Sequence, residues 1–275
     1  MIKLKKNIAI VFLTFNSELT IEKSLVKASK ISKNLYVVDS FSTDKTVKIC
    51  KKFKCKVIKR KFTNYSSQRN WIINKLNKNF LWQLHLDADE VLDNKLIHSI
   101  KKIIKNSINK KNFLLKRKNY FLGLKINFPG INIWHLRLFR SYSAKCEKRL
   151  YDQHFISKFK VQKIFDGFMH DNDMLNIHDW KQKHRKWAEM EANEVKKINT
   201  SVSKNIFKKN DPRHYSRKTK VLYYKLPRYL RVIIYFLYRY FLRLSFLDGK
   251  SGLLFSFYHI IWFRMLIDYK INRKK

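Results

Sequence analysis

Apolar runs of strand length alternate with amphipathic stretches through the first 90 residues. The run from Ile8 to Thr14 is uninterrupted, which is typical of a parallel strand buried on both faces. Further strands are expected at 35–39, 56–58 and 80–86, and helices at 17–30, 43–53 and 66–76, with Ser42 as the N-cap of the second helix. Strands that alternate with helices predict βαβ units, and therefore an α/β fold with a mixed, mainly parallel sheet flanked by helices.

The pattern changes after residue 90. A helix is expected at 94–106, aromatic-rich strands at 112–122, 131–140 and 160–165, and a long helix at 171–200. From about Val221, two apolar and aromatic segments, 226–244 and 251–271, are interrupted by basic residues that include Arg231 and Arg239. A spanning helix needs about 20 predominantly apolar residues, and a central Arg costs about 2.5 to 3.5 kcal/mol, so spanning is disfavoured.

The two C-terminal segments instead suit helices that lie in the interface of an anionic membrane, with basic residues opposite the apolar face. A pair of ordinary core helices is the alternative. We therefore expect a first domain at 1–205 and a basic, aromatic-rich helical appendage at 206–275 that associates with a membrane.

Charge narrows the choice of partners. Lys and Arg number 61 against 20 acidic residues, which gives a net charge of +41 and favours polyanions such as nucleic acid or anionic lipid. Much of the excess is scattered Lys beside Ile and Asn, a composition that a biased genome can produce, so no specific nucleic acid is expected. Cys50, Cys55 and Cys146 form no CxxC and no paired framework, which favours a reducing compartment.

Candidate chemistry lies where the strand at 80–86 runs into Asp87, Asp89 and Glu90. Ligands of α/β proteins gather at the carboxyl ends of strands. Asp87 and Asp89 can offer two hard oxygen ligands to Mg²⁺ or Mn²⁺, which keep other positions for water and substrate phosphate. A solvated acidic turn is the alternative. No glycine precedes Gly123, so no glycine-rich phosphate loop is available, and this favours metal and basic side chains as the phosphate-binding groups.

Four motifs occur in a characteristic order: Thr-Phe-Asn-Ser-Glu at 14–18, Val-Val-Asp-Ser-Phe-Ser-Thr-Asp-Lys-Thr at 37–46, Ser-Gln-Arg-Asn at 67–70 and Leu-Asp-Ala-Asp-Glu at 86–90. Together they resemble the family 2 glycosyltransferases. The likeness continues through 134–140 and 149–155, covers about residues 7–200, and is closest to the bacterial branch of lipopolysaccharide-core β-glucosyltransferases. This resemblance implies a GT-A fold, a nucleotide-diphosphate sugar donor, a divalent cation and inversion at the anomeric carbon.

The resemblance also assigns residues. Those expected to bind the nucleotide sugar are Thr14, Phe15, Asn16, Glu18, Asp39, Arg69, Asp87, Ala88, Arg137 and Arg140, with Asp39 on the base and the arginines near the diphosphate. Asp87 and Asp89 match the D-x-D motif, with Asp89 as the direct metal ligand. Apart from the resemblance, His170 is a weaker candidate for the metal or the diphosphate, with a structural histidine as the alternative. Asp152 takes the place of the general base, although its neighbours Tyr151 and Gln153 depart from the usual pattern. Each has a plain structural alternative, such as a turn cap for Asp39 or a turn carboxylate for Asp152.

Two departures concern the turn after the second strand. Phe41 and Lys45 stand where the family commonly carries glycine. If the turn needs a positive φ, Phe41 is strained there.

The expected enzyme transfers a sugar, with a UDP-sugar as the preferred donor, to a lipid-linked glycan during cell-surface polysaccharide or lipopolysaccharide synthesis. Its expected place is the cytoplasmic face of the bacterial inner membrane. The alternatives are transfer directly to polyprenyl phosphate, sugar hydrolysis by Asp89 and Asp152, and a non-catalytic basic protein that binds membrane or nucleic acid.

Overall fold

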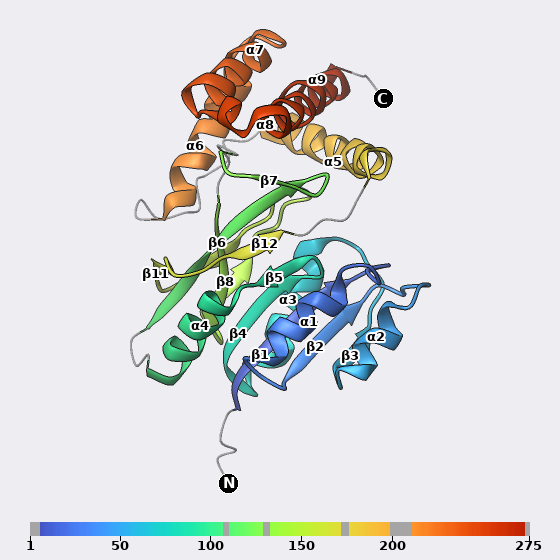
Figure 1. Ribbon diagram of the computed structural model, residues 1–275, viewed down its shortest axis with the longest axis vertical. Helices are drawn as coiled ribbons and strands as arrows, with labels where there is room; N and C mark the ends of the chain where they lie inside the picture. Colours follow the sequence, from blue (N-terminus) through green and yellow to red (C-terminus); the bar gives the residue numbers. More distant parts are fainter. Residues whose placement is uncertain (1–5, 107–109, 129–132, 172–175, 199–210, 273–275) are drawn as a thin grey trace. The chain divides into compact units, whose positions relative to one another are not determined.

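The computed structural model describes residues 6–106, 110–128, 133–171, 176–198 and 211–272 (Figure 1). Two compact units make up the chain. The sheet unit comprises 1–118, 133–148 and 153–172, and the C-terminal unit comprises 119–132, 149–152 and 173–275. The domain boundary expected after residue 205 stays a prediction.

A parallel core of four strands forms the first part of the sheet unit. The strands are β1 (Lys6–Thr14), β2 (Leu35–Asp39), β3 (Lys56–Lys59) and β4 (Phe80–Asp87), in the order β3-β2-β1-β4. Helices α1 (Ile21–Ser29), α2 (Thr46–Lys52) and α3 (Tyr65–Asn77) connect them (Figure 1). All three strand pairings are parallel, as the alternation of strands and helices predicts.

Strand β1 is buried on both faces, as its unbroken apolar run predicts. Ile8, Ile10 and Phe12 pack in the core cluster that includes residues of α1, α2 and α4 (Asn94–Asn106). Ala9 and Val11 point the other way and pack in the cluster that contains residues of α3. Side chains alternate across a strand, so helices on both faces bury the whole run, at about 1.5 to 3 kcal/mol for each large apolar side chain.

Antiparallel strands complete the sheet and make it mixed. Strand β8 (Trp134–Arg140) pairs with both β4 and β6 (Lys111–Phe121), β7 (Leu124–Ile126) pairs with β6, and β5 (Glu90–Leu92) pairs with β12 (Met169–Asp171). Strand β11 (Lys160–Lys163) pairs with β6 in parallel, and β9 (Ala144–Cys146) and β10 (Phe155–Ser157) form a separate hairpin. The prediction of an α/β fold with a mixed, mainly parallel sheet is confirmed.

Three boundaries differ from the sequence expectation. Helix α2 begins at Thr46, and Ser42 does not cap it, because its hydroxyl donates to Asp39 Oδ1 at 2.5 Å. Helix α1 begins at Ile21, because a turn at Ser17 precedes it. Asp171, expected to open a helix, ends β12, and the helix α5 begins at Ile177. Residues 131–132, 172–175 and 199–200 of the expected elements lie outside the described residues.

The C-terminal unit is mainly helical. Its helices are α5 (Ile177–Ile198), α6 (Pro212–Lys225), α7 (Leu230–Leu237), η1 (Tyr238–Leu242), η2 (Ser245–Asp248), α8 (Gly249–Ser256), η3 (Phe257–Trp262) and α9 (Phe263–Asn272). Ala188 and Ala192 of α5 pack with Phe263 and Ile267 of α9. Among the described helices, none combines the length and the apolar character that crossing a membrane requires.

Two arginines of this unit contradict the sequence expectation of a solvated basic face. Arg231 is buried, with Nε donating to Asp268 Oδ2 at 3.1 Å and Nη1 donating to the carbonyl oxygen of Tyr224 at 3.0 Å. Arg239 is also buried, and its Nη1 donates to the hydroxyl of Tyr235 at 2.6 Å. The ion pair with Asp268 makes the burial of Arg231 tolerable, and the sequence interval to Asp268 hides this pairing from a local reading.

Candidate active site

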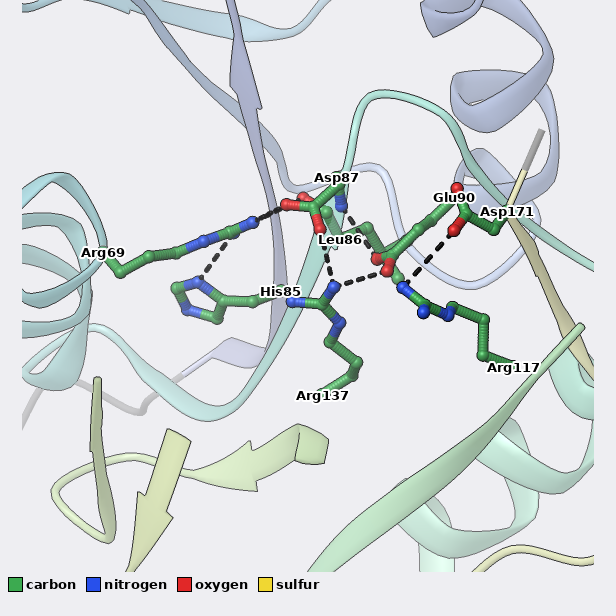
Figure 2. Close-up of polar contacts among 8 residues, drawn as sticks. All are labelled: Arg69, His85, Leu86, Asp87, Glu90, Arg117, Arg137 and Asp171. Atoms are coloured by element: carbon green, nitrogen blue, oxygen red, sulfur yellow. Dashed lines mark hydrogen bonds and ion pairs between the residues drawn. The ribbon is translucent and has the colours of Figure 1, made fainter. Parts of the chain in front are cut away.

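Asp87 ends β4 with each carboxylate oxygen held by a different guanidinium (Figure 2). Arg137 Nη2 of β8 donates to Oδ2 at 2.6 Å, and Arg69 Nη2 of α3 donates to Oδ1. Arg69 Nη2 also donates to the carbonyl oxygen of Leu86 at 3.2 Å. Burial alone would raise the pKa of Asp87, but Arg137 and Arg69 outweigh it and hold the pKa well below its usual range. The group is therefore a fixed carboxylate, with 42% of its side chain exposed.

Glu90 fixes the turn that follows. Its side chain is buried, accepts the backbone N–H of Asp87 at 2.9 Å and forms an ion pair with Arg137. Burial raises the pKa of Glu90 to about 7, with Asp87 adding to the rise and Arg137 opposing it. Ser24 of α1 donates to the carbonyl oxygen of Ala88 at 2.9 Å, which ties the same turn to a helix.

Two further residues, His85 and Arg117, lie beside this cluster (Figure 2). His85 is buried, with Nδ1 3.5 Å from Arg69 Nη1 and Nε2 3.0 Å from Gln83 Oε1. Burial, together with Arg69 and Arg137, keeps the pKa of His85 well below its usual range, so the ring is neutral. Arg117 of β6 pairs with Asp171 of β12 at 3.3 Å.

Sequence reasoning assigned no role to Glu90, His85 or Arg117. One signal was available in β4, where Gln83, His85 and Asp87 alternate with apolar residues and so share one face of an otherwise apolar strand. A buried polar face indicates a hydrogen-bonded network.

The donor set at the turn fits a hard divalent cation. Asp89 lies half-buried between β4 and β5, two residues from Asp87. Mg²⁺ is often held by one or two carboxylates together with substrate phosphates, rather than by a complete protein cage. Among the described residues, no cluster of three or more His, Cys, Asp or Glu is placed to hold a metal.

His170 is in β12, opposite Val91, and its Nε2 lies 3.9 Å from Asp93 Oδ2. Its predicted role as a metal ligand stays a prediction.

The loops after β1 and β2 meet at the carboxyl edge of the sheet, where Asp39 is fully buried. Thr14 Oγ1 donates to Asp39 Oδ1 at 2.9 Å, and the backbone N–H of Ser42 donates to Oδ2 at 2.9 Å. The structural role of Asp39 is thus to join the two strand ends. Its predicted contact with a base stays a prediction.

Side chains of the first loop also hold the backbone of the second. Asn16 Oδ1 accepts the N–H of Thr43, and Glu18 Oε2 accepts the N–H of Lys45, both at 2.9 Å. The rings of Phe15 and Phe41 remain exposed, at 61% and 53%. Hydrogen bonds therefore cross-link the two loops, with Thr14 and Asp39 buried beneath them and Phe15, Asn16 and Glu18 nearer the surface.

Phe41 adopts φ +64°, in the left-handed region that favours glycine. Lys45 has φ −76° and needs no glycine. Of the two departures from the family pattern, only Phe41 carries backbone strain.

The structure does not bring Arg140 to Asp87. Arg140 pairs in register with Trp82, and its guanidinium lies over the Trp82 ring at 4.4 Å. Five residues of β4 separate Trp82 from Asp87, roughly 16 Å along a strand.

Asp152 belongs to the C-terminal unit. Its Oδ2 lies 3.2 Å from Nζ of Lys220 on α6, and 38% of its side chain is exposed. Its role as general base stays a prediction.

Comparisons with known proteins define the family. The model of glycosyl transferase family 2 matches residues 9–161. An uncharacterized glycosyltransferase of Rickettsia bellii is 30% identical over 175 residues, covering 63% of this chain and 54% of the relative. One from Rickettsia typhi is 32% identical over 171 residues, covering 62% and 54%. The chain thus spans about half the length of these curated relatives.

Among solved structures, the mannosyltransferase PcManGT of Pyrobaculum calidifontis matches with a TM-score of 0.53 at 10% identity, covering 98% of this chain and 88% of that chain. At this identity the match shows the fold, which is GT-A. Because the family model covers more than half of the sequence and includes the Asp87 turn and both loops, the chain belongs to glycosyl transferase family 2.

Proposed function

We propose that the chain is an inverting glycosyltransferase that moves a sugar from a nucleotide-diphosphate sugar to an acceptor hydroxyl. The observation that carries this proposal is the Asp87 carboxylate, which Arg69 and Arg137 hold in place two residues before Asp89. This carboxylate lies at the carboxyl end of β4, within the residues that match the glycosyl transferase family 2 model. Ligands of open α/β sheets bind at this edge, where the cross-linked loops after β1 and β2 also end.

The loops would hold the nucleotide. Phe15 and Phe41 offer exposed rings on which a base can stack, and such rings prefer offset or edge contacts with other π systems. A UDP-sugar is the preferred donor by resemblance, and PcManGT was solved with GDP-mannose and Mn²⁺, so both bases belong in the test.

Asp89, with Asp87, would hold Mg²⁺ or Mn²⁺, which when bound would neutralise charge on the diphosphate leaving group. In the proposed reaction, the acceptor oxygen forms a bond to the anomeric carbon as the bond from that carbon to the diphosphate oxygen breaks on the opposite face. Asp152 takes the hydroxyl proton, a contribution of about 10²- to 10⁴-fold for a positioned base. The sugar configuration is inverted.

The exposed apolar side chains of α7 and η1 support the proposal that the acceptor is linked to a lipid. Their large apolar side chains are exposed with a spacing of three or four residues, on one face: Leu230, Ile233, Ile234, Leu237, Tyr238, Phe241 and Leu242. Arg231 and Arg239 lie on the buried side, so the usual arrangement of a water-facing helix is reversed.

Exposed basic residues precede and follow this segment in the sequence, namely Lys225, Arg228, Arg243 and Lys250. An apolar face with a basic rim is complementary to an anionic leaflet. We propose that the enzyme acts at the cytoplasmic face of the bacterial inner membrane, on a lipid-linked glycan in polysaccharide or lipopolysaccharide synthesis.

A thermal-shift screen against UDP-, GDP-, dTDP- and CMP-sugars tests the donor site, each donor being assayed with Mn²⁺ and with EDTA. Binding to the folded state stabilises it by about 2.7 kcal/mol at a ligand concentration of 100 Kd. We expect one donor class to raise Tm in a concentration-dependent way, and only with the metal. If folded protein shows no shift with any donor, the proposed donor site is wrong.

A further inference from the structure

We propose that Lys220 of α6 is a positioning residue that holds Asp152 in its ionised, proton-accepting form. This inference rests on the proposed function, in which Asp152 is the general base. It assigns part of the chemistry to a helix that lies beyond the residues matched by the family model.

Lys220 bridges two carboxylates. Its Nζ lies 3.2 Å from Asp152 Oδ2 and 2.7 Å from Glu191 Oε1 of α5. Glu191 is fully buried and also accepts the hydroxyl of Tyr224 at 2.9 Å, while Asp152 keeps 38% of its side chain exposed. The lysine is therefore anchored from the buried side by Glu191 and presents its charge to the exposed carboxylate.

The backbone at Asp152 is held by the same unit. Asp152 has φ +55°, a left-handed conformation that Asp adopts more readily than most residues. The ring of the preceding Tyr151 packs 5.6 Å from that of Trp187 on α5 and 6.1 Å from that of Phe263 on α9. Residues 149–152 pack with the C-terminal unit although the residues before and after them belong to the sheet unit. Helices α5, α6 and α9 thus set the position of this carboxylate.

Lys220 brings a positive charge to Asp152 in a region that holds charges of both signs. Arg149 of the same loop faces Glu191 at 3.8 Å and Glu194 at 3.9 Å, and Arg264 of α9 acts on Glu191. Burial alone would raise the pKa of Glu191, but Lys220, and then Arg264, outweigh it and lower the pKa. Glu191 is therefore an anion, and without the ammonium of Lys220 it would repel a charged Asp152.

The expected consequence is a change in pH dependence. Losing an opposite charge within about 4 Å and facing a like charge both raise the pKa of a carboxylic acid. A base must be ionised to accept a proton, so a higher pKa of Asp152 moves the acid limb of the kcat/KM profile to higher pH.

The test compares kcat/KM from about pH 3.5 to pH 9, a range that includes the ordinary Asp pKa of about 3.9, for wild type, Lys220→Met and Lys220→Arg. Tyr224→Phe is the control that removes a different contact to Glu191. We expect Lys220→Met to shift the acid limb up by about one pH unit, so that its rate falls by up to about tenfold on that limb and recovers at the pH plateau. Lys220→Arg should restore the wild-type limb, and Tyr224→Phe should not move it. If Lys220→Met does not fold, Lys220→Gln replaces it.

An acid limb that stays in place in folded Lys220→Met or Lys220→Gln protein, or an equal loss at every pH, overturns the inference. The variant Asp152→Asn distinguishes a wrong inference about Lys220 from a wrong proposed function. It should abolish turnover while donor affinity is kept. An Asp152→Asn protein with full activity would instead show that Asp152 is not the base.

Discussion

Single side chains fix the carboxylates on which the proposed chemistry depends. Asp87 is oriented by Arg69 and Arg137, and Asp152 by Lys220. In each case the cation is itself anchored by a buried glutamate, Glu90 or Glu191. Anchored charges need little reorganisation when a substrate diphosphate or a proton arrives, which is the condition for electrostatic stabilisation of a transition state.

Phe41 offers a prediction that separates strain from the loss of a side chain. Both Phe41→Gly and Phe41→Ala remove the ring, but only glycine is unstrained at φ +64°. Left-handed backbone costs other residues about 1 to 2 kcal/mol, and the extra freedom of glycine in the unfolded chain offsets part of this gain. We therefore expect the free energy of unfolding of Phe41→Gly to exceed that of Phe41→Ala by about 1 kcal/mol, measured in urea. Equal stabilities would show that the backbone carries no strain there.

At the scale of secondary-structure elements, apolar side chains are buried in one place and exposed in another. In β1 the apolar run is covered on both faces, as the sequence pattern predicts. In α7 and η1 the apolar residues face outwards and two arginines face inwards. The first arrangement builds a core, and the second suits a surface that meets lipid.

The exposed apolar face of α7 and η1 predicts that the protein binds to vesicles that contain anionic lipid. Ile233→Glu with Leu237→Glu removes two exposed apolar contacts from that face and adds two negative charges. We expect this double variant to lose at least about tenfold in partitioning, measured by vesicle sedimentation, since each buried CH₂ contributes about 0.8 kcal/mol.

Leu19→Glu with Val26→Glu, which makes equivalent changes at exposed apolar residues of the sheet unit, is the matched control and should bind like wild type. Equal binding of the two double variants would contradict a lipid-docking face. A dimer in solution that only Ile233→Glu with Leu237→Glu dissociates would show that a second copy covers this face instead.

The local pattern of apolar and polar residues was sufficient to predict the four parallel strands and the acidic turn that begins at Asp87. Strand periodicity and the polar residues at a strand end are both encoded in neighbouring residues. It failed where a partner is distant in sequence. Ser42 was expected to cap a helix, yet its hydroxyl donates a hydrogen bond to Asp39. Arg231 was expected at a polar face, yet Asp268 pairs with it inside the unit. The alternation of polar residues in β4 indicates a buried network at His85, but the arginines of that network, Arg137 and Arg117, come from strands whose pairing no local signal specifies.

For the whole molecule, a net charge of +41 favours anionic partners in general, so charge alone does not separate an enzyme from a basic binding protein. A diphosphate donor, an anionic leaflet and nucleic acid would all be attracted. The discriminating property is a specific carboxylate, since electrostatic binding to a polyanion should survive its loss.

The most direct test is therefore metal-dependent turnover in Asp89→Asn, with Asp166→Asn as a control that makes the same chemical change at an exposed carboxylate of the sheet unit. Release of nucleoside diphosphate from the donor identified by thermal shift is measured with Mn²⁺ and with EDTA. We predict that wild type and Asp166→Asn turn over only with the metal, and that Asp89→Asn falls at least about 100-fold with an unchanged Tm, since the loss of the metal removes several kcal/mol of charge stabilisation. Turnover that survives in Asp89→Asn, or that proceeds equally in EDTA, would contradict the proposed cation site and the function built on it.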